Sequence, residues 1–237
     1  MIFRTFLSTF FAALLIVFSA IFLSGCSSNK FENSIKIRVD NFPKYATPGL
    51  KKSHQLKQME QNFINKVVVK FGDRNAASRL WWQQGEKFMQ AGNADFAMRR
   101  YNQSWLLDPE NFQPYWGFSR VMMKGDNADE AIKYLEKALE LVAADPQKSA
   151  LLADLATAYS IKGENSHSYY SKANKAFSQS VKLDENYAPA WRRWAYSLYK
   201  QGRFAEALEK VNQAKALNAK PFSDKFITDL QQKLKQN

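Results

Sequence analysis

The stretch that decides the fold is WWQQGEKFMQAGNADFAMRRYNQSWLLDP, residues 81–109. Large and small side chains follow one another in it at fixed spacings, at the positions Trp81, Gly85, Phe88, Ala97, Tyr101, Ser104 and Pro109. Steps of three and four residues place side chains on one face of a helix. Ala91-Gly92-Asn93, between the two halves, has the composition of a turn. The stretch therefore predicts two helices joined by a tight turn.

The same spacing recurs along the chain. The alanine position is held by Ala97, Ala131, Ala173 and Ala207, at steps of 34, 42 and 34 residues. Four residues later come the large apolar side chains Tyr101, Leu135, Phe177 and Val211, and three later still the small ones Ser104, Ala138, Ser180 and Ala214. An earlier small position is held by Gly85, Ser119, Ala156 and Ala195. Small residues let two helices cross closely, and one pair cannot bury its apolar face alone, so neighbouring pairs must stack.

This pattern resembles the tetratricopeptide (TPR) repeat. The resemblance covers residues 78–222, about four repeats, and implies an all-α, right-handed superhelix of antiparallel helix pairs that binds other proteins. We expect an N-terminal capping segment at residues 55–77, with a helix that follows Ser53, has an apolar stripe of Leu56, Met59, Phe63 and Val67, and ends at Gly72-Asp73. We expect a C-terminal capping helix at residues 223–237, behind Ser223, with a stripe of Phe226, Ile227, Leu230 and Leu234.

Two repeats depart from the 34-residue period. In the second, the proline comes three residues late, at Pro146, so either the second helix or its exit turn is longer. The third is eight residues longer than the period (42 against 34), around 164–172. Eight residues make about two helical turns or a loop. With Gly163-Glu164-Asn165 as the turn between helices, the favoured interpretation is a loop whose Tyr169 and Tyr170 rest on the surface, rather than a partner contact.

Residues 1–25 resemble the signal peptide of bacterial lipoproteins. Arg4 precedes a mostly apolar run from Phe6 to Leu23. Leu23-Ser24-Gly25-Cys26 fits the lipobox, whose cysteine is acylated and becomes the new N-terminus, and Cys26 is the only cysteine of the chain. The resemblance implies a lipid anchor on Cys26, and Ser27 in place of aspartate implies the outer membrane, with the body facing the periplasm. The alternative is an uncleaved anchor, for which the apolar run is short.

Residues 26–54 are predicted to form a flexible basic tether. The chain has a formal net charge of +12, and residues 26–80 hold eleven Lys and Arg against four Asp and Glu, a net of +7. Basic side chains close to a membrane are attracted to anionic lipids, by roughly 1 kcal/mol each. Nucleic acid is the other common partner of a basic chain, but an exported protein is removed from it, so we expect no nucleic-acid binding. The alternation of apolar and basic residues at 35–39 is a short strand signature that would pack on the repeats, stay mobile or join a partner sheet.

The first helix of each TPR pair lines a concave groove. Counting i, i+4 and i+7 from the residue after Trp81 gives the candidate protein-binding residues Trp82, Glu86, Trp116, Arg120, Arg192, Tyr196 and Tyr199. The other inner positions are Met89, Met123, Ala153, Thr157 and Ser160. Aromatic and arginine side chains dominate binding hot spots, although some of these would instead pack on the N-terminal helix or the tether. The best-known clamp of the family, Lys and Asn holding a C-terminal carboxylate, is not matched, because Trp82 and Glu86 stand in those places.

The sequence has no motif that predicts catalysis. It lacks a Gly-rich phosphate loop, HExxH and GxSxG. His54 and His167 have no ligand-type spacing, so no metal or cofactor is expected. The expected function is that of a membrane-anchored cell-envelope lipoprotein, not an enzyme, which acts as an adaptor or assembly factor for envelope proteins. The alternatives are a pilotin-like assembly factor for a pilus or secretin, and a binder of glycan or anionic lipid.

Overall fold

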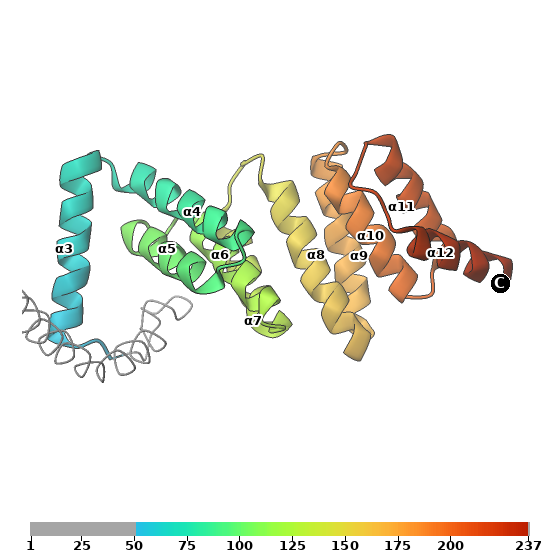
Figure 1. Cartoon of the computed structure of the whole chain (residues 1–237), viewed down its shortest axis with the longest axis horizontal. Helices are drawn as coiled ribbons and strands as arrows, with labels where there is room; N and C mark the ends of the chain where they lie inside the picture. The colour runs from blue at the N-terminus through green and yellow to red at the C-terminus, as the bar shows by residue number, and fades with distance from the viewer. Residues whose placement is uncertain (1–50, 237) are drawn as a thin grey trace, which may run out of the picture. The chain divides into compact units, whose positions relative to one another are not determined.

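The computed structural model describes residues 51–236, and within that part of the chain all regular structure is helical (Figure 1). The helices are α3 (His54–Phe71), α4 (Arg74–Gln90), α5 (Ala94–Leu107), α6 (Phe112–Lys124), α7 (Ala128–Leu141), α8 (Lys148–Asn165), α9 (Ser168–Leu183), α10 (Ala188–Lys200), α11 (Phe204–Ala216) and α12 (Asp224–Gln236). The predicted all-α class is confirmed. The predicted signal peptide, Cys26 and the tether up to residue 50 lie outside the described residues.

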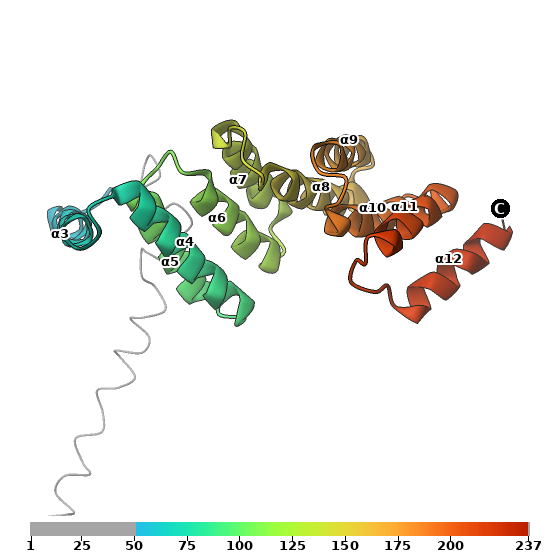
Figure 2. The ribbon, with the colours of Figure 1, turned by 90° about the horizontal axis from the view of Figure 1, so that it is seen from above.

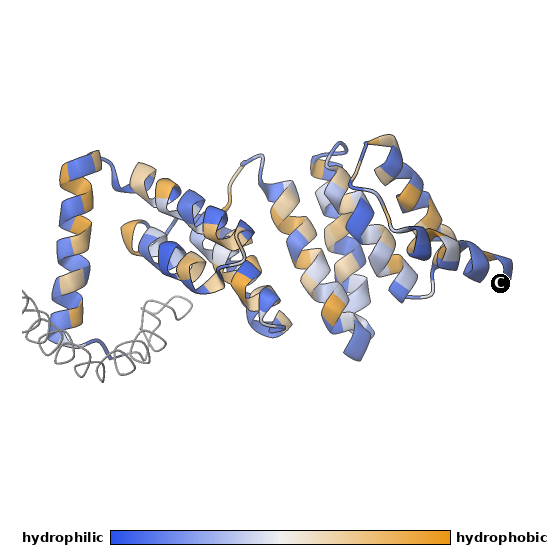
Figure 3. Ribbon diagram, in the orientation of Figure 1, coloured by the Kyte–Doolittle hydropathy of each residue, from blue (hydrophilic) through white to orange (hydrophobic). Residues whose placement is uncertain are grey.

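The helices pair as the repeat spacing predicts. α4 packs against α5, α6 against α7, α8 against α9 and α10 against α11, and consecutive pairs stack through α5 on α6, α7 on α8 and α9 on α10 (Figures 1 and 2). The alanines at the predicted crossing position, Ala97, Ala131, Ala173 and Ala207, are all fully buried. Every described helix carries both apolar and polar residues (Figure 3). The apolar positions therefore build a core between the helices of each pair and between neighbouring pairs.

Polar side chains fix where most of the early helices begin. Ser53, Asp73, Asn93, Asn111 and Asn127 precede α3 to α7, and each side chain accepts a hydrogen bond from a backbone N–H of the first turn. These bonds satisfy donors that a helix start leaves without a partner. At the other end of the described chain, the hydroxyl of Ser223 accepts from the backbone N–H of Phe226 at 3.3 Å. The predicted caps Ser53 and Ser223 are thus confirmed.

The N-terminal helix ends at Gly72-Asp73 as predicted, but the first repeat begins earlier than predicted. α3 ends at Phe71 and α4 begins at Arg74, so the expected boundary between residues 77 and 78 falls inside the first helix of the first repeat. Val67 packs with Ala77 and Leu107. Met59, predicted to face the same way as Val67, is 64% exposed. Only the C-terminal half of α3 therefore buries the predicted apolar stripe against the repeats.

The two departures from the repeat period are now assigned. α7 is as long as α5, 14 residues each, so the late Pro146 lengthens the exit turn over residues 142–147. α8 and α9 have 18 and 16 residues, against 13 and 14 in α6 and α7, so most of the eight extra residues extend both helices and the others lie in the longer exit turn. The predicted turn at residues 163–165 is wrong, because α8 continues through Asn165. Tyr170 is buried because its ring lies against Gly163, where a Cβ would stand 2.6 Å from Tyr170 Cδ1.

None of the helices within residues 51–236 combines the length and the apolar character needed to cross a membrane.

Candidate binding groove on the first helices of the repeats

The inner face of the array has a joint between its second and third repeats. Among the first helices, α4 packs against α6 and α8 against α10, whereas α6 and α8 are not closely packed. The lengthened exit turn lies at this joint. Side chains connect the two helices instead: Gln113 Nε2 donates to Gln147 Oε1 at 3.0 Å, and Trp116 Nε1 donates to Asp154 Oδ2 at 2.6 Å.

Four charged side chains, one from each first helix, form a network across this face. Arg120 on α6 pairs through Nη1 with Glu86 Oε2 on α4, and its Nε lies 3.5 Å from Asp154 Oδ2 on α8. Arg193 on α10 pairs through Nη1 with Asp154 Oδ1. The side chains of Glu86 and Asp154 are 16% and 18% exposed, and those of Arg120 and Arg193 are 31% and 36% exposed. The carboxylates are therefore recessed and the guanidinium groups lie nearer to solvent.

The pKa values of Arg120 and of the neighbouring Tyr101 are both raised. Burial alone would lower the pKa of Arg120, but the carboxylates of Asp154 and Glu86 outweigh it and raise that pKa above its ordinary value. The hydroxyl of Tyr101 donates to Glu86 Oε1 at 2.7 Å. Burial, followed by the charge of Glu86, raises the pKa of Tyr101 well above its ordinary range. Arg120 thus remains a cation and Tyr101 remains a hydrogen-bond donor.

A pocket of about 370 Å³ lies beside the network. Its apolar lining is Met89, Met123 and Leu135, and its polar lining is Ser119, Arg120, Asp154, Thr157 and Arg193. These residues come from α4, α6, α7, α8 and α10, so all four repeats contribute. The hydroxyls of Ser119 and Thr157 donate to the backbone carbonyls of Trp116 and Ala153 within their own helices.

The predicted tryptophans support this pocket from below. Trp82 and Trp116 are buried, and their rings stack at a centroid distance of 6.1 Å. The guanidinium carbon of Arg120 lies 4.3 Å from the centroid of the Trp116 ring. Of the predicted groove residues, Glu86, Arg120, Trp82 and Trp116 are brought together here. The two tryptophans stand as packing residues beneath the groove.

The remaining predicted residues lie against the C-terminal helix. The ring of Tyr196 is 4.3 Å from that of Phe226 on α12, and the hydroxyl of Tyr199 donates to Asp229 on α12. The guanidinium carbon of Arg192 lies 5.5 Å from the ring centroid of Phe222, just before α12. The inner face of the last repeat is thus covered by residues 222–229. The geometry separates Arg192, Tyr196 and Tyr199 from the pocket at Arg120.

Asp154 and Arg193 were missed by the sequence reasoning. Each stands three residues before a predicted inner position, Thr157 and Tyr196, and residues three apart share one helix face. One signal in the sequence could have found these two residues. The charges on neighbouring first helices alternate in sign from repeat to repeat, as Glu86, Arg120, Asp154 and Arg193.

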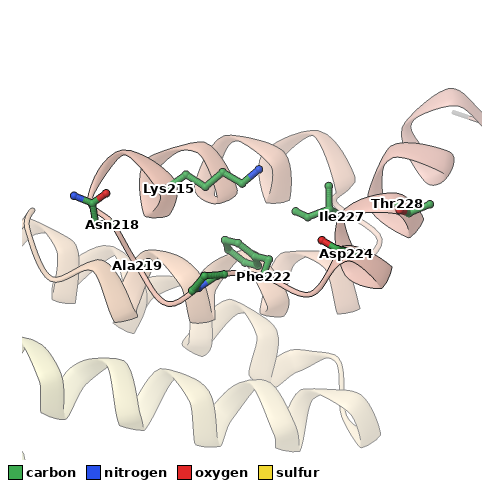
Figure 4. A pocket seen from close by; sticks show the side chains of 8 residues that line it. Lys215, Asn218, Ala219, Phe222, Asp224, Ile227 and Thr228 are labelled. Atoms are coloured by element: carbon green, nitrogen blue, oxygen red, sulfur yellow. The ribbon is translucent and has the colours of Figure 1, made fainter.

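A second pocket, of about 430 Å³, lies between α11 and α12 (Figure 4). Its lining is Lys215, Asn218, Ala219, Pro221, Phe222, Asp224, Ile227 and Thr228. It involves only the last repeat and the C-terminal helix. Among residues 51–236, no cluster of three His, Cys, Asp or Glu side chains is placed to hold a metal ion.

Comparison with known proteins identifies the repeat type. A family model described as tetratricopeptide repeat matches residues 88–155. Among solved structures, a thermophilic TPR protein of Thermus thermophilus is 18% identical, with a TM-score of 0.53 over 59% of this chain and 74% of that one. YrrB, described as a TPR protein with an unusual peptide-binding site, is 19% identical, with a TM-score of 0.48 over 65% of this chain and 74% of that one. No curated protein matches the sequence. The chain therefore contains TPR repeats and has a TPR-type fold.

Proposed function

We propose that this protein is a protein-interaction adaptor that binds a peptide segment of its partner in the pocket beside Arg120. One observation carries the proposal: a single pocket takes its lining from the first helices of all four repeats and from α7, and this lining combines apolar and charged side chains. Apolar floors supply binding energy, and a few polar groups at the rim fix orientation.

The rim suits a polypeptide. Arg120 and Arg193 are held by ion pairs to recessed carboxylates, so their side chains are partly ordered before a ligand arrives. Preordered side chains lose less conformational entropy on binding. A peptide backbone offers carbonyl acceptors to such guanidinium groups, and one of its apolar side chains can lie between Met89 and Met123. We therefore propose binding and not catalysis as the activity.

Site-directed photocrosslinking tests this proposal on the full-length chain. A benzophenone amino acid in place of Thr157, in the pocket, should crosslink a discrete partner in cells. The same amino acid in place of Lys133, which is exposed on the second helix of its repeat, is the matched control. Crosslinks from position 133 but not from position 157 would move the binding surface off the groove and reject the proposal.

We further propose that a lipid on Cys26 tethers the repeats to the outer membrane, facing the periplasm, so that the partner is an envelope protein. The lipobox-like Leu23-Ser24-Gly25-Cys26 and the apolar run before it support this proposal. The net charge of +7 in residues 26–80 also suits a segment that lies next to anionic lipid headgroups.

A further inference from the structure

In the pocket beside Arg120, the protein leaves more hydrogen-bond donors than acceptors available to a ligand. Both oxygens of Glu86 are engaged, one by Tyr101 and one by Arg120. Both oxygens of Asp154 are engaged as well, Oδ1 by Arg193 and Oδ2 by Trp116 and Arg120. The recessed carboxylates are thus already satisfied by the protein.

Within residues 51–236, the guanidinium groups of Arg120 and Arg193 still have N–H groups that do not contact an acceptor. A guanidinium carries five N–H donors. Among residues 51–236, Arg193 contacts an acceptor only through Nη1, and Arg120 only through Nη1 and Nε. The remaining N–H groups lie on the two most exposed members of the network. A ligand at the rim therefore meets cationic donors, although the four charges of the network sum to zero.

The apolar floor adds a second requirement. Met89 and Met123 flank the pocket beside these donors, and methionine side chains adapt to apolar groups of different shape. The ligand must present an apolar group and an anionic acceptor a short distance apart. A peptide carries that pair as an apolar residue next to aspartate or glutamate.

The pocket also selects an internal segment over a chain end. Its lining comes from all four repeats, from Met89 in the first to Arg193 in the fourth. The side chains of Arg120 and Arg193 are 31% and 36% exposed, so their guanidinium groups lie at an open rim that a continuing peptide chain can cross. A side-chain carboxylate, and not a terminal one, is the anion that such a peptide brings to Arg193.

We propose that the groove recognises an extended, internal peptide segment in which an acidic side chain binds Arg193 and Arg120 while a neighbouring apolar side chain fills the space between Met89 and Met123. This inference rests on the proposed adaptor function and adds the chemistry of the partner. Charge-assisted hydrogen bonds to a planar guanidinium are strong and directional, so the acidic residue sets specificity.

The test uses the full-length protein in detergent and an array of nonapeptides, acetylated and amidated to remove terminal charges. The central pair joins each apolar residue with Glu, Gln or Lys. The strongest binder is then titrated by fluorescence anisotropy as its Glu and Gln versions. We expect the Gln version to bind about tenfold more weakly or worse to the wild type, and this preference for Glu to be clearly smaller in Arg193→Gln, where only Arg120 remains to bind the acidic side chain.

Arg192→Gln is the matched control. Arg192 is the adjacent arginine on α10 but contacts Tyr196 and Phe222 outside the pocket, so this variant should keep the preference for Glu. Arg193→Gln leaves Asp154 its contacts with Trp116 and Arg120, and an unchanged thermal unfolding curve would show that the fold is kept.

Binding without a preference for Glu, or a preference of unchanged size in Arg193→Gln, would overturn this inference and leave the adaptor function intact. A requirement for a free C-terminal carboxylate in an unamidated copy of the array would also overturn it. If no peptide binds and Thr157 yields no crosslink in cells, the adaptor function itself fails.

Discussion

Ser149 and Ser180 exchange hydrogen bonds across the third repeat. The hydroxyl of Ser149 donates to the backbone carbonyl of Ser180 at 3.1 Å, and the hydroxyl of Ser180 donates to the carbonyl of Ser149 at 2.8 Å. Both residues are buried. The first repeat has the same arrangement in Ser78 and Ser104. The equivalent positions of the second and fourth repeats hold Phe112 with Ala138 and Ala188 with Ala214. These side chains have no hydroxyl group, so the serine exchange joins the helices in the first and third repeats only.

Replacing one of these serines should destabilise the fold measurably. Ser180→Ala removes one buried hydrogen bond between α8 and α9, and we expect the free energy of unfolding to fall by about 1 kcal/mol. Urea unfolding followed by circular dichroism measures the change. Ser171→Ala, at an exposed position on the same helix, is the control and should change little. Equal midpoints for both variants would show that the buried exchange contributes nothing net.

Two glycines make room for one tyrosine ring. A Cβ on Gly85 would stand 2.4 Å from Tyr101 Cε1, and a Cβ on Gly117 would stand 2.5 Å from Tyr101 Cδ1. Gly85→Ala should therefore destabilise the protein, because overpacking costs about 1–3 kcal/mol and exceeds the gain in helix propensity of about 1 kcal/mol.

The matched control for Gly85→Ala is Gly125→Ala, whose Cβ would lie no closer than 3.6 Å to its neighbours. Tyr101→Leu should relieve the clash, so the double variant with Gly85→Ala should be less destabilised than the sum of the two single changes. Simple additivity in thermal unfolding would contradict the proposed packing.

The carboxylate of Asp154 joins three helices, so removing its charge should weaken the array. It accepts from Trp116 on α6 and Arg193 on α10 and pairs with Arg120. Hydrogen bonds to charged groups contribute about 1.5–3 kcal/mol, and we expect Asp154→Asn to lose about that amount in urea unfolding. Asp129→Asn, which breaks the exposed pair with Lys162, should lose less than about 1 kcal/mol. Equal losses of stability in the two variants would show that Asp154 contributes no more than an exposed ion pair.

Stability should fall in strongly alkaline solution, in part through Tyr134. Burial, followed by the charge of Glu130, raises the pKa of Tyr134 from 10.0 to about 12. Between these values the folded chain keeps a proton that the unfolded chain has lost, so this contribution is complete below pH 10 and disappears as the pH rises toward 12. Tyr134→Phe should make the decline of stability from about pH 10 to 11 shallower. The same slope in both proteins would contradict the raised pKa.

The lipid anchor is tested by labelling. Cells fed a clickable fatty acid should label the wild-type protein and not Cys26→Ala, because Cys26 is the only cysteine of the chain. The variant should also keep its leader and migrate as the larger precursor. Label on Cys26→Ala, or none on the wild type, would reject the lipoprotein proposal.

The fold could be predicted because the information for it is local and repeated. The spacing of Ala97, Ala131, Ala173 and Ala207 fixes which helix faces meet, and all four are buried. The course of the third repeat could not be predicted, because Gly163 looks like a turn residue by composition. Its lack of a side chain serves instead to admit the ring of Tyr170 inside a helix pair.

The groove could be predicted only in part. A count of i, i+4 and i+7 found Arg120 and Glu86, but it gave Arg192 where Arg193 reaches the pocket. The count assumes that every repeat presents the same face. That face changes in the third repeat because of the longer exit turn before α8, and in the fourth because other residues cover Tyr196 and Tyr199. Neither effect can be read from the spacing of the repeats.

The side-chain joint between α6 and α8 has a mechanical consequence. The buried core continues past this joint, because α7 packs on α8, and Leu151 and Leu155 of α8 belong to the same core cluster as Trp116. Bending the array there must therefore deform a dense core, and only the inner face, where Trp116 meets Asp154, is joined by separate hydrogen bonds. The pocket lies on this inner face, and its lining comes from both sides of the joint. A peptide bound there would bridge the second and third repeats, so binding would stiffen the inner face at the place where the first helices pack least closely.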